Sequence, residues 1–126
     1  GPAWVSGDET QLQLATSNLI RNAIESIRDA NPAVRRVGVT VTTSGNRLLL
    51  TVRDSGPGLA EGFSLSAVLA STKAAGTGLG LYLVQAVMDT HGGCLQMTSV
   101  AGGGAEAVLS LPRIAKPAQR QKTVTP

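Results

Sequence analysis

The apolar residues of this chain switch twice from a helical spacing to an alternating one. Spacings of three and four residues predict amphipathic helices, whereas strict alternation predicts strands with one buried face. Each alternating pair surrounds a turn, Ser44-Gly45-Asn46 in the first case and Gly102-Gly103-Gly104 in the second, which predicts two β-hairpins. The expected elements are a helix at 8–30, strands at 37–41 and 48–52, a helix at about 77–91, and strands at 95–100 and 105–111.

The order helix, hairpin, long connection, helix, hairpin predicts an α/β (α+β) two-layer sandwich, with the helices on one face of a mixed, mostly antiparallel sheet. A length of 126 residues and an apolar content of 42% suit one domain with a real core, which we assign to residues 1–112. Residues 113–126 hold four of the 11 basic residues and no acid, so we expect a basic, disordered tail. With aromatics at only 2%, the net charge of +3 is not interpreted as a nucleic-acid footprint.

A glycine-studded loop, Gly76-Thr77-Gly78-Leu79-Gly80-Leu81, runs directly into the second predicted helix. Unpaired N–H groups at the start of a helix attract anions, and glycines let a phosphate approach the backbone closely. The glycine spacing differs from the dinucleotide-binding fingerprint, and the Gly-Lys pair of a P-loop does not occur in the chain. Taken alone, the loop is equally consistent with a flexible turn before a helix.

Two further stretches carry polar residues at unusual places. Asn18 and Asn22 lie one turn apart in the first predicted helix, although asparagine is a poor helix former, so they either face solvent or serve a site. At the end of the second predicted strand, Asp54 precedes Gly56 and Gly58. There a carboxylate could accept a hydrogen bond and the glycines could clear space for a flat ligand, although an ordinary turn would use the same residue types.

The connection at 59–75 is long and weakly patterned, with at most about one helical turn expected, and long connections of this kind are often lids. The only cysteine, Cys94, excludes an internal disulfide and is expected to be a small buried residue in a reducing compartment. The only histidine, His91, is expected to cap a helix C-terminus as an imidazolium. Because the chain has no apolar run long enough to cross a bilayer, we expect no direct membrane contact by it.

Three of these stretches, taken in their order, resemble the N, G1 and G2 boxes of the ATP-binding catalytic domain of bacterial sensor histidine kinases. They are Asn18-Leu19-Ile20-Arg21-Asn22-Ala23, Asp54-Ser55-Gly56-Pro57-Gly58 and Gly76-Thr77-Gly78-Leu79-Gly80-Leu81. The resemblance covers residues 3–112 and is specific as a set, although each box is weak alone. It implies the Bergerat-type fold shared with gyrase, Hsp90 and MutL ATPases, with a flexible ATP lid at about 59–76 in this chain.

The resemblance also implies roles for individual residues. Asn22 would be catalytic and would hold the Mg²⁺ ion that bridges the ATP phosphates, and Lys73 would be catalytic by reaching the terminal phosphoryl group. Asp54 would accept a hydrogen bond from the adenine 6-amino group, which favours ATP over GTP. The implied nucleotide-binding set is Asn18, Asn22, Asp54, Gly56, Gly58, Lys73, Gly76, Thr77, Gly78, Leu79, Gly80 and Leu81.

Asn18 stands where gyrase-like ATPases of this fold carry a glutamate that activates water, and an amide cannot act as that base. The resemblance therefore implies slow hydrolysis and transfer of the γ-phosphoryl group to a histidine on a separate dimerisation domain, then to the receiver domain of a response regulator. Since His91 lies at a helix end, unlike the acceptor of the family, the acceptor is expected outside this chain. The implied location is the cytoplasm, for a parent protein that is either free or anchored in the inner membrane.

Departures from the family pattern leave two alternatives open. Glu25 stands where a basic residue near the phosphates is usual, and Ala70 precedes Ser71-Thr72-Lys73 where an aromatic run is usual. One alternative is a catalytically silent nucleotide-binding interaction module. The other is an anti-sigma-factor-type serine kinase of the same fold, against which the ending His91-Gly92-Gly93 of the second predicted helix argues.

Overall fold

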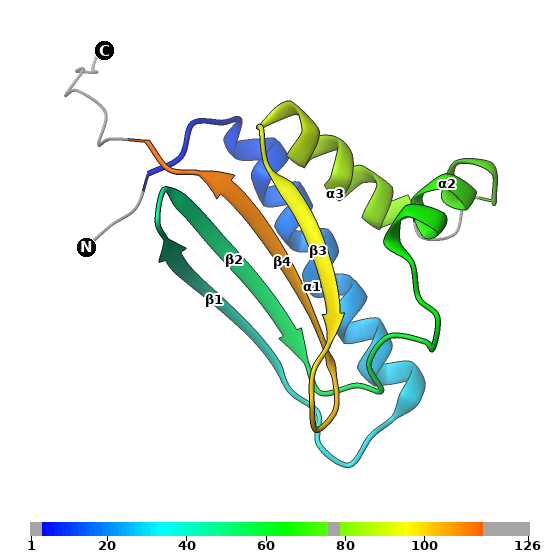
Figure 1. Ribbon diagram of the computed structural model, residues 1–126. Helices are drawn as coiled ribbons and strands as arrows, with labels where there is room; N and C mark the ends of the chain where they lie inside the picture. The colour runs from blue at the N-terminus through cyan, green and yellow to red at the C-terminus, as the bar shows by residue number, and fades with distance from the viewer. Residues whose placement is uncertain (1–3, 76–78, 115–126) are drawn as a thin grey trace.

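The structure is a computed structural model that describes residues 4–75 and 79–114. Its order of elements is helix, hairpin, two helices, hairpin (Figure 1). Both predicted hairpins and both predicted helices are confirmed, with ends close to the expected ones. The elements are α1 (Glu9–Ala30), β1 (Val37–Ser44), β2 (Arg47–Asp54), α2 (Leu65–Ala75), α3 (Leu79–Thr90), β3 (Cys94–Ser99) and β4 (Ala105–Pro112).

Helix α1 begins and ends at residues that cap it. The Asp8 carboxylate accepts a hydrogen bond from the backbone N–H of Gln11 at 2.9 Å, which satisfies one of the free donors of the first turn. At the other end Asn31 adopts a left-handed conformation with φ 50°, and its N–H donates to the carbonyl of Ile27 at 2.7 Å. Between these caps the helix buries a stripe made by Ala15, Leu19, Ala23 and Ile27.

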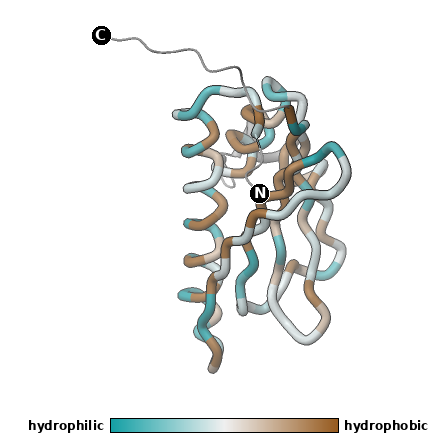
Figure 2. Tube along the Cα trace, turned by 90° about the vertical axis from the view of Figure 1, so that its left-hand side faces the viewer, coloured by the Kyte–Doolittle hydropathy of each residue, from teal (hydrophilic) through white to brown (hydrophobic). Residues whose placement is uncertain are grey.

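The four described strands form an antiparallel sheet in the order β1-β2-β4-β3. Leu50 and Leu95 pair with Leu109 from its two sides, and the face that carries these residues is covered by α1 and α3. Figure 2 views the layers edge on, with α1 on one side and the strands on the other. The predicted two-layer sandwich is therefore confirmed, and the pairing is antiparallel throughout the described strands. The side chains buried most completely between the layers are Leu19, Val84, Met88 and Leu109.

The connection between the two hairpins contains helix α2, so the expectation of about one helical turn at most is wrong. Ser64 begins this helix: its hydroxyl accepts from the N–H of Ala67 at 3.3 Å, and its carbonyl accepts from the N–H of Val68 at 3.0 Å. Alanine and leucine, which favour helices, dominate the segment. Packing of the half-buried Leu65, Val68 and Leu69 against the core supplies the stabilisation that the weak sequence pattern did not reveal.

His91 closes the end of α3 as expected. Its Nε2 accepts a hydrogen bond from the backbone N–H of Asp8 at 2.9 Å, and its Nδ1 lies 2.7 Å from the carbonyl oxygen of Val87. The ring therefore joins the end of α3 to the start of α1.

Cys94 is exposed, which corrects the expectation of burial. It begins β3, and the next residue, Leu95, is buried under the helices. Because neighbouring side chains of a strand point to opposite faces, Cys94 lies on the face of the sheet that the helices do not cover.

The two ends of the described chain lie side by side. Trp4 and Ile114 form a β-bridge, and the N–H of Arg113 donates to the carbonyl of Asn46 at 2.8 Å. Backbone pairing thus continues past residue 112, and the rest of the predicted tail, residues 115–126, lies outside the described residues. Within the described part of the chain, none of the helices is both long enough and apolar enough to span a membrane.

Candidate functional site

Asn18 and Asn22 lie on the flank of α1 that meets the start of α3. The Asn18 amide donates to the carbonyl of Leu14 at 2.9 Å, which leaves its Oδ1 without a hydrogen bond to any described residue. A Cβ atom placed on Gly80 would lie 3.1 Å from Asn18 Oδ1 and 3.7 Å from Asn22 Oδ1. The backbone at the start of α3 therefore lies close to both asparagines, and the first and third of the sequence boxes meet here.

Asp54 is the one acid that the described part of the chain buries, with 8% of its surface exposed. Its Oδ1 accepts hydrogen bonds from the backbone N–H of Gly56 at 2.8 Å and of Ala105 at 3.4 Å. Burying a carboxylate away from a cation is unfavourable unless donors surround it. Since Oδ2 accepts nothing from the described residues, the carboxylate keeps an acceptor for a ligand that carries a donor.

Two close approaches of the backbone fix the position of Asp54. A Cβ atom on Gly56 would lie 2.7 Å from Ser26 Oγ and 3.0 Å from Asp54 Oδ1. Gly104, with φ 93°, comes closer still, because a Cβ atom there would lie 2.0 Å from the carbonyl oxygen of Asp54. Only glycine allows this contact between the start of β4 and the end of β2.

A hollow of about 100 Å³ brings Asn22, Asp54 and Gly58 together. It is smaller than the roughly 300–1,000 Å³ of pockets that enclose a drug-sized ligand, so it can enclose only part of a nucleotide. The complete lining is Leu19, Asn22, Ala23, Ser26, Val52, Asp54, Gly58, Leu59, Met97, Ala105 and Ala107.

Several lining residues did not emerge from the sequence. Ser26 could have been found, because it follows Asn22 by one helical turn and so lies on the same flank of α1. The small residues Ala105 and Ala107 could also have been found, since they alternate on a strand that follows a glycine turn. Met97 comes from the neighbouring strand β3, and only the pairing of the strands places it here.

The residues expected to hold phosphates are described only in part. Lys73 lies in α2, but its side chain is outside the described structure, as are Gly76, Thr77 and Gly78. Leu79 begins α3, and Gly80 lies close to the asparagines as above. The Leu81 side chain is buried in the core at 8% exposure, so only its backbone is available to a ligand.

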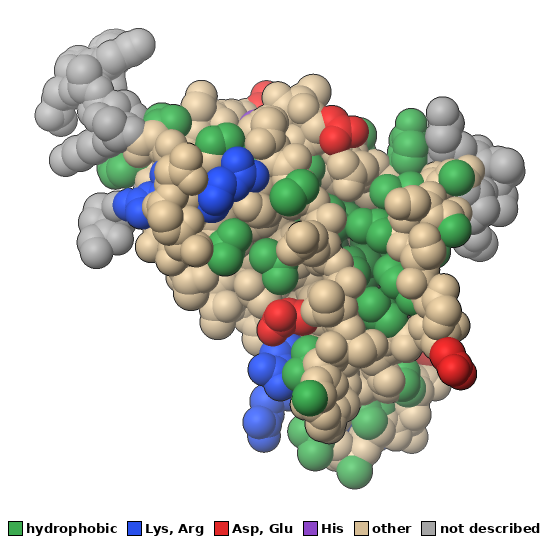
Figure 3. Space-filling view, in the orientation of Figure 1, with side chains coloured by type: hydrophobic (Ala, Val, Ile, Leu, Met, Phe, Trp, Pro, Cys, Tyr) green, Lys and Arg blue, Asp and Glu red, His purple; other side chains and the backbone are tan. Residues whose placement is uncertain are grey.

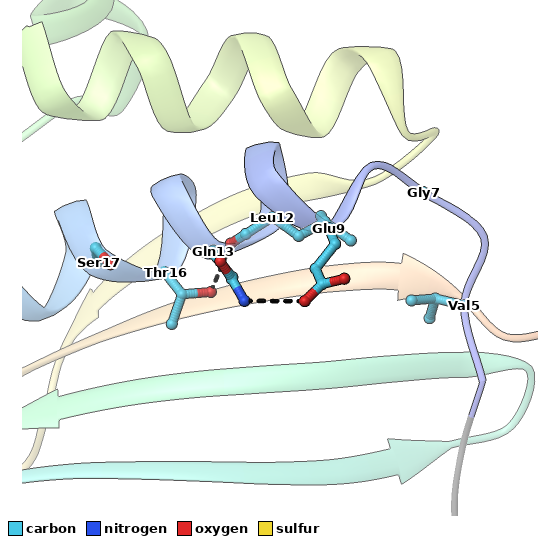
Figure 4. A pocket seen from close by; sticks show the side chains of 7 residues that line it. All are labelled: Val5, Gly7, Glu9, Leu12, Gln13, Thr16 and Ser17. Carbon is cyan, nitrogen blue, oxygen red and sulfur yellow. Dashed lines mark hydrogen bonds between the residues drawn. The ribbon is translucent and has the colours of Figure 1, made fainter. Parts of the chain in front are cut away.

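A larger hollow, about 570 Å³, lies beside the first half of α1 (Figure 4). Its polar side chains bond within the helix: Gln13 donates to Glu9 at 3.2 Å, and the hydroxyl of Thr16 donates to the carbonyl of Leu12 at 2.9 Å. None of the residues predicted for the nucleotide site lines this hollow. Size alone therefore does not identify the site.

The comparison with known proteins assigns the chain to a family. Residues 7–115 match the family described as histidine kinase-, DNA gyrase B-, and HSP90-like ATPase. The match covers most of the chain, and the chain belongs to this family.

The similar curated proteins include sensor histidine kinases and a transport sensor. The chain is 37% identical over 111 residues to the sensor histidine kinase ZraS of Escherichia coli O157:H7, covering 86% of this chain and 23% of ZraS. It is 34% identical over 114 residues to the C4-dicarboxylate transport sensor protein DctB of Pseudomonas aeruginosa, covering 87% of this chain and 18% of DctB. The chain thus spans less than a quarter of the length of these relatives.

Solved structures agree with this assignment. The mycobacterial sensor histidine kinase MprB has a TM-score of 0.74 and 28% identity, over 89% of this chain and 76% of that one. Full-length ShkA, solved in complex with AMPPNP, has a TM-score of 0.74 and 25% identity, over 93% of this chain and 24% of that one. The resemblance to the catalytic domain of histidine kinases is therefore confirmed, and so is the fold that it implied.

Proposed function

We propose that this domain binds ATP with Mg²⁺ and donates the γ-phosphoryl group to a histidine on a separate dimerisation domain of its parent protein. The phosphoryl group then passes to the receiver domain of a response regulator. One observation carries the proposal: Asn22 from α1, Asp54 from the end of β2 and Gly80 from the start of α3 converge on one flank of α1. Each of these residues comes from a different one of the three sequence boxes. One box alone is weak evidence for a nucleotide site, whereas three boxes that lie close together in space support one.

The nucleobase is proposed to bind at Asp54. The open acceptor Oδ2 suits the 6-amino group of adenine, whereas guanine would present a carbonyl oxygen to the same carboxylate. Gly58 and Ser26 line the hollow beside Asp54, and the tight backbone at Gly56 leaves no room for a side chain between Ser26 and Asp54. ATP is therefore favoured over GTP.

The phosphates are proposed to lie between α1 and the start of α3. The Asn22 side chain is half-buried and makes no hydrogen bond to a described residue, so its carbonyl oxygen fits as a ligand of Mg²⁺. When bound, Mg²⁺ would neutralise phosphate charge. Lys73 and the backbone from Gly76 to Leu81 are assigned to the phosphates on the strength of the family boxes, with 59–76, including α2, as the lid.

Asn18 affects the reaction because its side chain has no carboxylate that could act as a base. Its amide cannot remove a proton from water, so ATP should be hydrolysed slowly and kept for a histidine nucleophile. The free Oδ1, which faces Gly80, instead contributes to the wall beside the phosphates. The sensor histidine kinases among the relatives support this reading over a silent module or a serine kinase. We place the reaction in the cytoplasm.

A phosphotransfer assay tests the proposal. The chain is incubated with Mg²⁺, γ-labelled ATP and the histidine-bearing dimerisation domain of the parent protein, and both polypeptides are followed for an acid-labile, alkali-stable label. We expect the label to appear on the dimerisation domain and not on this chain. The Asn22→Ala variant of this chain should leave the dimerisation domain unlabelled. The variant His91→Gln should transfer as well as the wild type, because His91 is engaged by two backbone groups. Label on this chain that disappears with His91→Gln would contradict the proposal.

A further inference from the structure

Two arginines line a third hollow, on the side of the sheet that the helices leave open. The hollow measures about 410 Å³ and is lined by Val34, Arg36, Gly38, Arg53, Asp54, Ser55 and Gly103. Arg53 follows the buried Val52, so its side chain points to the opposite face of β2. Figure 3 shows this open face, with Lys or Arg side chains gathered at two places along it.

The two guanidinium groups differ from other arginines of the sheet in having no partner among the described residues. Arg47 donates to the hydroxyl of Ser110 at 2.8 Å and to its carbonyl at 3.0 Å, and Arg113 donates to the carbonyl of Gly45 at 3.2 Å. Hydrogen bonds and ion pairs of this kind are absent from the Arg36 and Arg53 side chains within the described structure. Two like charges at one hollow repel each other unless an anion lies between them.

The neighbours of Arg53 explain why the hollow is open. On β1 the residue paired with Arg53 is Gly38, and nothing lies within 4 Å of a Cβ atom placed there. On β4 the paired residue is Glu106, yet within the described residues no ion pair of 4.0 Å or less joins it to Arg53. The Asp54 carboxylate bonds to Gly56 and Ala105 and so is turned away from this face.

The loop that carries Arg36 is held in place. The hydroxyl of Ser55 donates to the carbonyl of Val34 at 2.7 Å and accepts from the N–H of Arg36 at 2.7 Å. The N–H of Ser55 donates in turn to the carbonyl of Arg36 at 3.0 Å. These bonds tie residues 34–36 to the end of β2, so the backbones that carry Arg36 and Arg53 form one unit.

We propose that Arg36 and Arg53 bind a carboxylate or phosphate group in this hollow, whose lining shares only Asp54 with the hollow at the proposed nucleotide site. The planar guanidinium group donates in pairs to carboxylate and phosphate oxygens, which makes it the side chain best suited to such groups. Val34, 54% exposed at the rim, adds an apolar contact for the carbon atoms next to the anionic group. The anionic group comes either from a small free anion or from an acidic segment of a partner protein.

Nuclear magnetic resonance titrations of the whole chain at constant ionic strength test this site. The probes are inorganic phosphate, succinate and a hexaglutamate peptide, and the reporters are the amide signals of Gly38 and Ser55. We expect saturable shifts with at least one probe, and binding weakened about tenfold or more in the double variant Arg36→Gln/Arg53→Gln. The matched control is Arg28→Gln, since Arg28 is exposed at the end of α1 and does not line the hollow.

The outcomes separate the sources and decide the proposal. Saturation by phosphate or succinate identifies a free anion, saturation by the peptide alone identifies an acidic segment, and both support the site. Three results would overturn the proposed site. They are an affinity that is unchanged in the double variant, an affinity that Arg28→Gln weakens equally, and no binding of any of the three probes. The double variant should still bind an ATP analogue like the wild type, so failure here is distinguishable from failure of the proposed kinase function.

Discussion

The two ends of the proposed nucleotide site are built differently. The nucleobase end belongs to the core: Asp54, Gly56, Ala105 and Ala107 are all buried where β2 meets β4. The proposed phosphate end lies between α1 and the start of α3, with α2 in the proposed lid, and none of the described side chains of α2 is fully buried. The proposed base contacts therefore lie in the core, whereas Asn22, the side chain proposed to hold Mg²⁺, is only half-buried.

The largest effect is expected at the nucleobase end, from Gly104→Ala. The new methyl group would lie 2.0 Å from the carbonyl oxygen of Asp54 at a positive φ of 93°, so β2 and β4 would have to separate. We expect the free energy of unfolding to fall by about 3 kcal/mol or more, measured by urea denaturation. The matched control is Gly103→Ala, which has φ 119° but no atom within 4 Å of the new methyl group. Backbone strain alone should lower the free energy of unfolding of Gly103→Ala by about 1–2 kcal/mol. If both variants lost the same free energy, the close contact between residue 104 and the Asp54 carbonyl would contribute nothing.

At the phosphate end, Asn22→Ala should weaken binding without unfolding the domain. The Asn22 side chain is half-buried and unpartnered among the described residues, so the free energy of unfolding should change by no more than about 0.5 kcal/mol. Loss of an oxygen ligand should weaken binding of an ATP analogue about tenfold with Mg²⁺ present, and much less without it. The control is Ser17→Ala, on an exposed part of the same helix. If Asn22→Ala weakened binding equally with and without Mg²⁺, the assignment of Asn22 as a ligand of Mg²⁺ would be wrong.

The smallest effect is expected from Gly80→Ala, where the asparagines lie close to the start of α3. Alanine favours the helix by up to about 1 kcal/mol, but its methyl group would lie 3.1 Å from Asn18 Oδ1. We expect stability to change by less than about 1 kcal/mol and affinity for the analogue to fall only a few-fold, about 1 kcal/mol or less. In an Asn18→Ala background, Gly80→Ala should lower the affinity for the analogue by a smaller factor, because the new methyl group no longer meets the Asn18 side chain. An unchanged cost would mean that Asn18 and Gly80 act independently.

The sequence singled out more residues at the proposed nucleobase end than elsewhere. Asp54 and its glycines drew attention because they follow an alternating strand, and Asn18 and Asn22 because they break the preferences of a helix. Helix α2 was missed because its apolar residues follow no clean period, and packing against the core decides its structure. Met97 and the pair of Arg36 with Arg53 depend on which strands lie side by side, and this register is not readable from local patterns.

A calorimetric titration of the chain with a non-hydrolysable ATP analogue in the presence of Mg²⁺ tests whether Asp54 recognises adenine. GTP serves as the competitor nucleotide, Asp54→Asn as the variant, and Asp89→Asn as the control, since Asp89 is an exposed acid of α3 that bonds to Gln85. We predict binding of the analogue, little or no binding of GTP, and an affinity lowered about tenfold or more by Asp54→Asn but not by Asp89→Asn. Binding that is equally strong in Asp54→Asn, or equal for the two nucleotides, would contradict the assignment of Asp54 to adenine.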